Sequence, residues 1–154
     1  MSVPEHVFMP PAGVRARQSG PFIPPLLIIP FIVYNIVAFV FFGGDPAGWS
    51  NTLFAIPMVS GTHWAVSAGD AMIVLSLLLL FFELLKSTRI ATANILEHMT
   101  SMVVFVLLLI EFLLVGAASS SVFFLILVMA LIDVVAGFTM SITSASRDMS
   151  MAPH

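Results

Sequence analysis

Four long apolar stretches alternate with short polar segments along the chain, and each stretch has the length of a membrane-crossing helix. An α-helix needs about 20 apolar residues to cross the hydrocarbon core of a bilayer. The pattern therefore predicts an all-α integral membrane protein, a bundle of four transmembrane helices at about residues 22–42, 65–85, 90–115 and 122–142.

The polar segments complete the predicted organisation. Residues 1–20 are predicted as an N-terminal arm and residues 143–154 as a polar tail, which leaves residues 21–142 as the membrane domain. Pro30 lies inside the first stretch and predicts a kink there. The second and third stretches are separated by only a few residues, which predicts a tight antiparallel pair of helices.

The segment between the first two stretches is rich in Gly and Pro and predicts a loop. Within this loop, residues 49–60 are too short to span a membrane and too apolar for an ordinary loop, so we expect them to lie along the membrane interface. Trp49 and Trp64 flank the segment, and amphipathic indole rings favour the headgroup level. The two tryptophans are therefore predicted interface anchors.

Composition supports burial in lipid and excludes several functions. Hydrophobic residues make up 60% of the chain and charged residues 8%, whereas a soluble domain carries about 25% charged residues. The net charge of -3 and the absence of a basic run argue against nucleic acid. The chain has no cysteine, and it carries no phosphate-binding, hydrolase or metalloprotease motif. We therefore expect no enzymatic activity.

The basic residues predict the orientation. They precede the first stretch, separate the second from the third and follow the fourth, so all five fall on one side of the membrane: Arg15, Arg17, Lys86, Arg89 and Arg147. Short loops rich in Lys and Arg stay in the cytoplasm. Both termini are therefore predicted to be cytoplasmic.

Five ionisable residues fall inside the predicted helices, where each needs a partner, a proton or water: Asp70, Glu97, His98, Glu111 and Asp133. Asp70 and Glu111 are expected at similar depths on neighbouring helices, so they can meet. Asp133 is the deepest and is expected to be protonated or hydrogen-bonded. Glu83, closer to the cytoplasmic boundary, is expected to be compensated by Lys86 and Arg89.

Helical spacing places the polar residues on faces that contact other helices. One stripe on the third stretch contains Ser101 between Glu97 and Glu111. On the fourth, Ala130 and Gly137 flank Asp133, and small residues permit close approach of helices. Asn35 on the first stretch is expected to bond to a neighbouring helix.

These residues leave three interpretations of function. The favoured one is a non-catalytic accessory or scaffold subunit of a membrane complex, or a homo-oligomer, in which the buried acids hold helices together. The second is proton- or cation-coupled transport through Asp70, Glu111 and Asp133. The third is a redox subunit that binds haem through His98, which needs a symmetric dimer or a partner for its second histidine. No metal site or other cofactor is predicted.

Part of the chain resembles a known group of proteins. The run GDAMIVLSLLLLFFELLKSTR, followed by ILEH, EFLLVG, FFLI and LIDVVAGF, is similar to small uncharacterised four-span inner-membrane proteins of alphaproteobacteria. The resemblance implies the inner (cytoplasmic) membrane of a bacterium and implies no activity.

Overall fold

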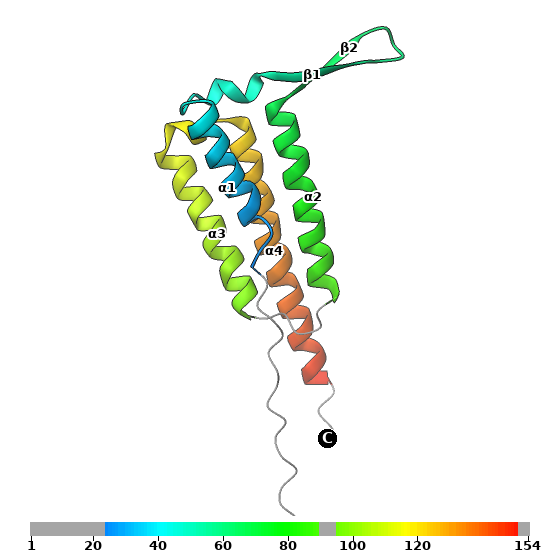
Figure 1. Ribbon diagram of the computed structural model, residues 1–154. Coiled ribbons are helices and arrows are strands. Elements are labelled where there is room, and N and C mark those ends of the chain that lie inside the picture. The colour runs from blue at the N-terminus through cyan, green and yellow to red at the C-terminus, as the bar shows by residue number, and fades with distance from the viewer. Residues whose placement is uncertain (1–23, 90–94, 151–154) are drawn as a thin grey trace, which may run out of the picture.

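The computed structural model of the chain describes residues 24–89 and 95–150 (Figure 1). The predicted N-terminal arm with Arg15 and Arg17 lies outside the described residues, and so do the side chains of Arg89, Glu97 and Arg147. The described chain is mostly helical, with four α-helices that alternate in direction.

The first helix, α1 (Ile28–Ile36), is followed directly by a π-helical turn (Val37–Phe41). Because α1 begins at Ile28, Pro30 lies in its first turn, where a backbone N–H is not needed for the helix. The kink predicted at Pro30 is therefore not required. Gly43 and Gly44 follow the π-helical turn, and their positive φ angles of 61° and 87° suit glycine.

The segment predicted as a loop contains regular structure. A 3-10 helix (Pro46–Ser50) is capped by Asp45, whose Oδ1 accepts a 2.9 Å hydrogen bond from the Ala47 N–H. It is followed by two antiparallel strands, β1 (Thr52–Pro57) and β2 (His63–Ser67). The predicted interfacial segment 49–60 therefore forms the end of the 3-10 helix, all of β1 and part of the turn. We call the end of the molecule that carries these strands the hairpin end (Figure 1).

The three longer helices are α2 (Ala68–Arg89), α3 (Ile95–Leu114) and α4 (Ser121–Ser150), with a 3-10 turn (Gly116–Ala118) before α4. Helix α4 continues through much of the segment predicted as a polar tail. It packs closely against both α2 and α3 and lies between them, with α1 in front (Figure 1). The prediction that α2 and α3 are a tightly packed pair is therefore wrong, because α4 occupies the space beside each of them.

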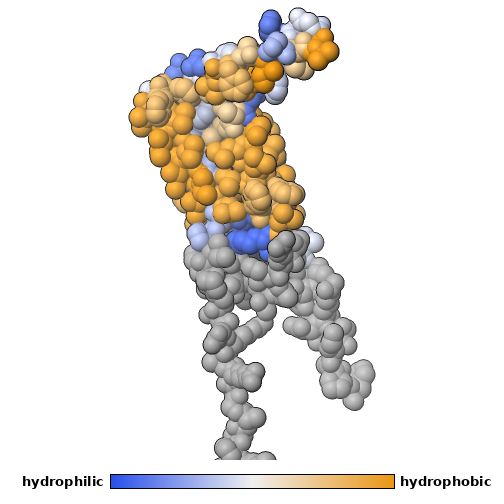
Figure 2. Space-filling view, turned by 45° about the vertical axis from the view of Figure 1, so that its right-hand side comes forward, coloured by the Kyte–Doolittle hydropathy of each residue, from blue (hydrophilic) through white to orange (hydrophobic). Residues whose placement is uncertain are grey.

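The core lies around α4, against which α1, α2 and α3 pack, and the outward faces of the helices are apolar. Side chains such as Leu27, Leu108, Phe123 and Ile126 are fully buried. Large hydrophobic side chains on α2, α3 and α4 are exposed, and Figure 2 shows hydrophobic residues over the sides of the helices with hydrophilic residues near both ends.

Two of the four helices are long and apolar enough to cross a membrane. They are the 19-residue segments Ala68–Lys86 and Ser121–Thr139, with mean hydropathies of 2.1 and 2.6. Only 28% of the first window and 44% of the second are buried within the protein. Shorter apolar helical segments run over Ile28–Phe41 and His98–Leu114.

Candidate functional site

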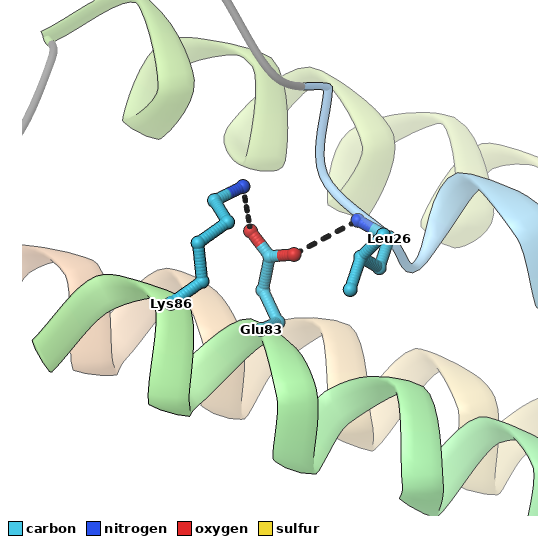
Figure 3. Close-up of polar contacts among 3 residues, drawn as sticks. All are labelled: Leu26, Glu83 and Lys86. Atoms are coloured by element: carbon cyan, nitrogen blue, oxygen red, sulfur yellow. Dashed lines mark hydrogen bonds and ion pairs between the residues drawn. The ribbon is translucent and has the colours of Figure 1, made fainter. Parts of the chain in front are cut away.

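The Glu83 carboxylate on α2 joins an ion pair to a hydrogen bond from the segment just before α1, at the end opposite the hairpin, which we call the ion-pair end (Figure 3). Glu83 and Lys86 lie one turn apart on α2, and the Lys86 Nζ is 2.9 Å from Glu83 Oε1. The other oxygen, Oε2, accepts a 2.9 Å hydrogen bond from the backbone N–H of Leu26. Glu83 is buried, and its side chain satisfies a backbone donor that precedes the first helix. The compensation of Glu83 by Lys86 predicted from the sequence is confirmed.

Asp133 brings α4 into the same region. It is buried, and the Ser101 hydroxyl on α3 is its hydrogen-bonding partner. Glu83, Lys86 and His98 also lie near Asp133. We call Glu83, Lys86, Ser101 and Asp133 the polar cluster; its members lie on α2, α3 and α4.

His98 packs against α4 beside the polar cluster. A Cβ atom at Gly137 would lie only 2.5 Å from His98 Nδ1, so the glycine provides the space for the ring. The edge of the ring also meets Phe138, with ring centroids 4.1 Å apart. Its Nε2 atom is buried with no hydrogen-bond partner within the described part of the chain. Gly137, predicted as a close-approach residue, thus accommodates a side chain rather than a second backbone.

Glu111 pairs with Asn35 and not with Asp70. Asn35 Nδ2 donates to Glu111 Oε2 over 3.2 Å and to the Phe31 carbonyl oxygen over 3.1 Å. This bond joins α1 to α3, as predicted for Asn35. The other carboxyl oxygen, Oε1, is buried and has no hydrogen-bond partner among the described residues.

Asp70 caps the start of α2. Its Oδ2 accepts hydrogen bonds from the backbone N–H of Ser67 at 2.8 Å and from the Ser67 hydroxyl at 2.7 Å, and the Ser67 hydroxyl accepts from the Asp70 N–H at 3.1 Å. This is a reciprocal capping box. The expectation that Asp70 meets Glu111 is therefore wrong, because each acid is engaged by a different nearby donor. The Ser-x-x-Asp spacing before an apolar run was the sequence signal for this role.

An aromatic cluster closes the hairpin end. The rings of Tyr34 and Trp49 stack with centroids 4.5 Å apart, and Phe123 meets Tyr34 edge-on at 4.7 Å. The Tyr34 hydroxyl donates to the Ala117 carbonyl at 2.8 Å and lies 2.7 Å from the Ser120 hydroxyl. Trp49 is 4% exposed, so it packs in the interior instead of lying free at an interface, whereas Trp64 is 53% exposed.

The polar cluster and the Asn35–Glu111 pair are separated by apolar side chains. Going from Ser101 towards Glu111 along α3, the inward positions are Val104 and Leu108, and the facing positions on α4 are Ala130 and Ile126. All four are buried. The described residues therefore place no polar side chain on these facing positions between the two sites.

Metal-ligating residues are scattered over the described chain. No group of three or more His, Asp or Glu side chains gathers among the described residues. His63 lies on β2 at the hairpin end and His98 lies near the start of α3 at the opposite end, so one chain does not bring these two histidines together. Comparison of the chain with known protein families, curated proteins and solved structures finds no match.

Proposed function

We propose that the protein is a four-span integral membrane protein that serves as a non-catalytic accessory or scaffold subunit of a membrane complex or a homo-oligomer. The two long apolar helices are mostly unburied within the protein, so their outward faces suit lipid or another transmembrane helix better than water. Helix α3, with 20 residues, reaches about 30 Å, the thickness of a hydrocarbon core. Little of the described chain extends beyond the helices.

The proposed orientation places the ion-pair end in the cytoplasm. The helices alternate in direction, so the segments that carry the five basic residues all connect to that end. Basic residues flank the cytoplasmic ends of transmembrane helices. Both termini would then be cytoplasmic and the hairpin would lie outside, at the inner membrane if the chain is bacterial, as its sequence resemblance implies.

The observation that carries the scaffold assignment is the way the helix acids are used. Glu111 bonds to Asn35 between α3 and α1, Asp133 to Ser101 between α4 and α3, and Glu83 accepts from the Leu26 N–H ahead of α1. Interhelical hydrogen bonds of this kind stabilise packing in membranes. Such contacts leave the outward apolar faces available for association with other helices.

Native mass spectrometry of the protein after gentle extraction from native membranes tests this assignment. The expected result is a defined oligomer or a complex with other membrane proteins. Asp133→Asn, which keeps hydrogen bonding but cannot titrate, is expected to leave that assembly intact. A monomer without partners in both preparations would falsify the scaffold proposal.

The rival proposal is proton- or cation-coupled transport through the helix acids Asp70, Glu111 and Asp133. The apolar layer between Asp133 and Glu111 argues against a relay through both. Proton flux in proteoliposomes separates the proposals: transport predicts flux that Asp133→Asn abolishes, and a scaffold predicts none.

An absorption spectrum of the purified protein tests haem binding at His98, which predicts a Soret band.

A further inference from the structure

The β1–β2 hairpin has two unlike faces. Phe54 pairs with Val66 and Ile56 with Trp64, while Ala55 pairs with Ala65 and Pro57 with His63. Because successive residues of a strand point to opposite faces, the first two pairs share one face and the second two share the other. We call the face with Phe54, Ile56, Trp64 and Val66 the bulky face.

The bulky face begins at the junction of the hairpin with the helices. Val66 is 8% exposed and is buried where β2 joins α2, while Phe54, Ile56 and Trp64 farther out on the same face are exposed. The hairpin projects sideways from the end of the helices (Figure 1). The exposed side chains of the bulky face therefore lie on the part of the hairpin that projects beyond this junction.

The surface that joins the hairpin to the helices is apolar and uncharged. A groove of about 510 Å³ runs between the π-helical turn and α2, and its lining includes Val37, Phe41, Leu53, Ala71 and Leu75. Leu53 belongs to β1, so the hairpin borders the groove. Residues 51–67 contain no Asp, Glu, Lys or Arg. The apolar surface of the helices thus continues onto the hairpin.

We infer that the bulky face rests on the phospholipid headgroup region of the outer leaflet and inserts its large side chains at the boundary with the acyl chains. This inference rests on the membrane insertion proposed above. A membrane that surrounds the helices would end near the level at which the hairpin leaves them, and the ring of Trp64 suits that level. A lipid surface also supplies apolar contact for a two-stranded ribbon, which is marginally stable alone in water.

Backbone chemistry sets the depth of the hairpin. A two-stranded ribbon has unpaired N–H and C=O groups along both outer edges. These groups need water, so the ribbon cannot sink into the hydrocarbon core. With no charged side chain, its lipid contact depends on buried apolar area and not on anionic headgroups.

Paired cysteine variants test the face assignment, and the chain has no native cysteine to interfere. Ile56→Cys and its neighbour Ala55→Cys lie on opposite faces of β1, and Trp64→Cys and Ala65→Cys repeat the comparison on β2. The variants are placed in phosphatidylcholine nanodiscs, which leave both membrane surfaces accessible, and are reacted with a water-soluble maleimide. The cysteine on the bulky face is expected to react about tenfold more slowly in each pair, because lipid shields it.

The outcomes separate this inference from the proposed function. Equal or reversed rates in both pairs overturn the inference, and protection seen only in native membranes would assign the bulky face to a protein partner instead. Extraction of the wild-type protein with alkaline carbonate tests membrane insertion independently. If the protein is extracted, the proposed function fails; if it resists and the pairs react alike, only the hairpin assignment fails.

Discussion

The two ends of the helices are held together by different chemistry. At the ion-pair end, a buried carboxylate binds an ammonium group and the Leu26 N–H. At the hairpin end, the contacts are the stacked rings of Tyr34 and Trp49 and neutral hydrogen bonds from Tyr34 to the turn before α4. The segment before α1 is thus tied to α2 at one end, and Tyr34 in the last turn of α1 is tied to the turn before α4 at the other.

The difference follows from where the chain carries cations. No Lys or Arg occurs between residues 37 and 85 or between residues 90 and 146. Three acids in these regions are engaged by neutral donors: the Ala47 N–H for Asp45, Ser67 for Asp70 and the Asn35 amide for Glu111. Glu83, beside Lys86, is the acid with an ammonium partner in the described chain. The basic residues that set the proposed orientation therefore also decide which end can use an ion pair.

The largest expected effect is on the aromatic cluster. Trp49→Ala removes a buried ring that stacks on Tyr34 and meets Phe42 edge-on, and we expect it to lower the free energy of unfolding by about 3–5 kcal/mol. The matched control is Trp64→Ala, which removes an exposed ring and should change the free energy of unfolding by less than about 0.5 kcal/mol in detergent. Unfolding by SDS in mixed micelles, followed by circular dichroism, gives both values. Equal losses for the two tryptophans would contradict the assignment of Trp49 to the core.

The ion pair is expected to have the next largest effect. Glu83→Ala removes the acceptor of both Lys86 and the Leu26 N–H, and we expect a loss of about 3 kcal/mol because the remaining groups are largely buried. The double variant Glu83→Leu with Lys86→Leu should recover part of that loss, since no ammonium group is left without this partner. The same unfolding assay measures both. If the double variant is less stable than Glu83→Ala, the ion pair stabilises the fold by more than the neutralisation of one buried charge by the other.

Contacts between residues close in sequence were predictable, and the arrangement of the helices was not. The Glu83–Lys86 pair follows from i, i+3 spacing on one helix, and the burial of Ser101, Ala130 and Asp133 follows from the helical stripes. The predicted contact between Asp70 and Glu111 required α2 and α3 to be neighbours because they are consecutive. Packing decides adjacency, and α4 lies between them.

The hairpin end was the hardest region to predict. Residues 52–57 are apolar on both faces of the strand, so the sequence lacks the polar-apolar alternation that marks a half-buried strand. The register became visible only through the pairing of β1 with β2. The amphipathic indole ring of Trp49 predicts a place at the interface, whereas its burial depends on stacking against Tyr34, which is distant in sequence.

The smallest expected effect isolates the hydrogen bonds of the hairpin end from its ring packing. Tyr34→Phe keeps the stacking on Trp49 but leaves the buried Ala117 carbonyl without this donor, and we expect a loss of about 1–2 kcal/mol in the same assay. Combining it with Ser120→Ala should give a coupling of about 0.5–1 kcal/mol, because the two hydroxyls lie 2.7 Å apart. If Tyr34→Phe lowers the free energy of unfolding as much as Trp49→Ala does, the hydroxyl and not the rings stabilises this end. The two ends would then differ only in using charged or neutral hydrogen bonds.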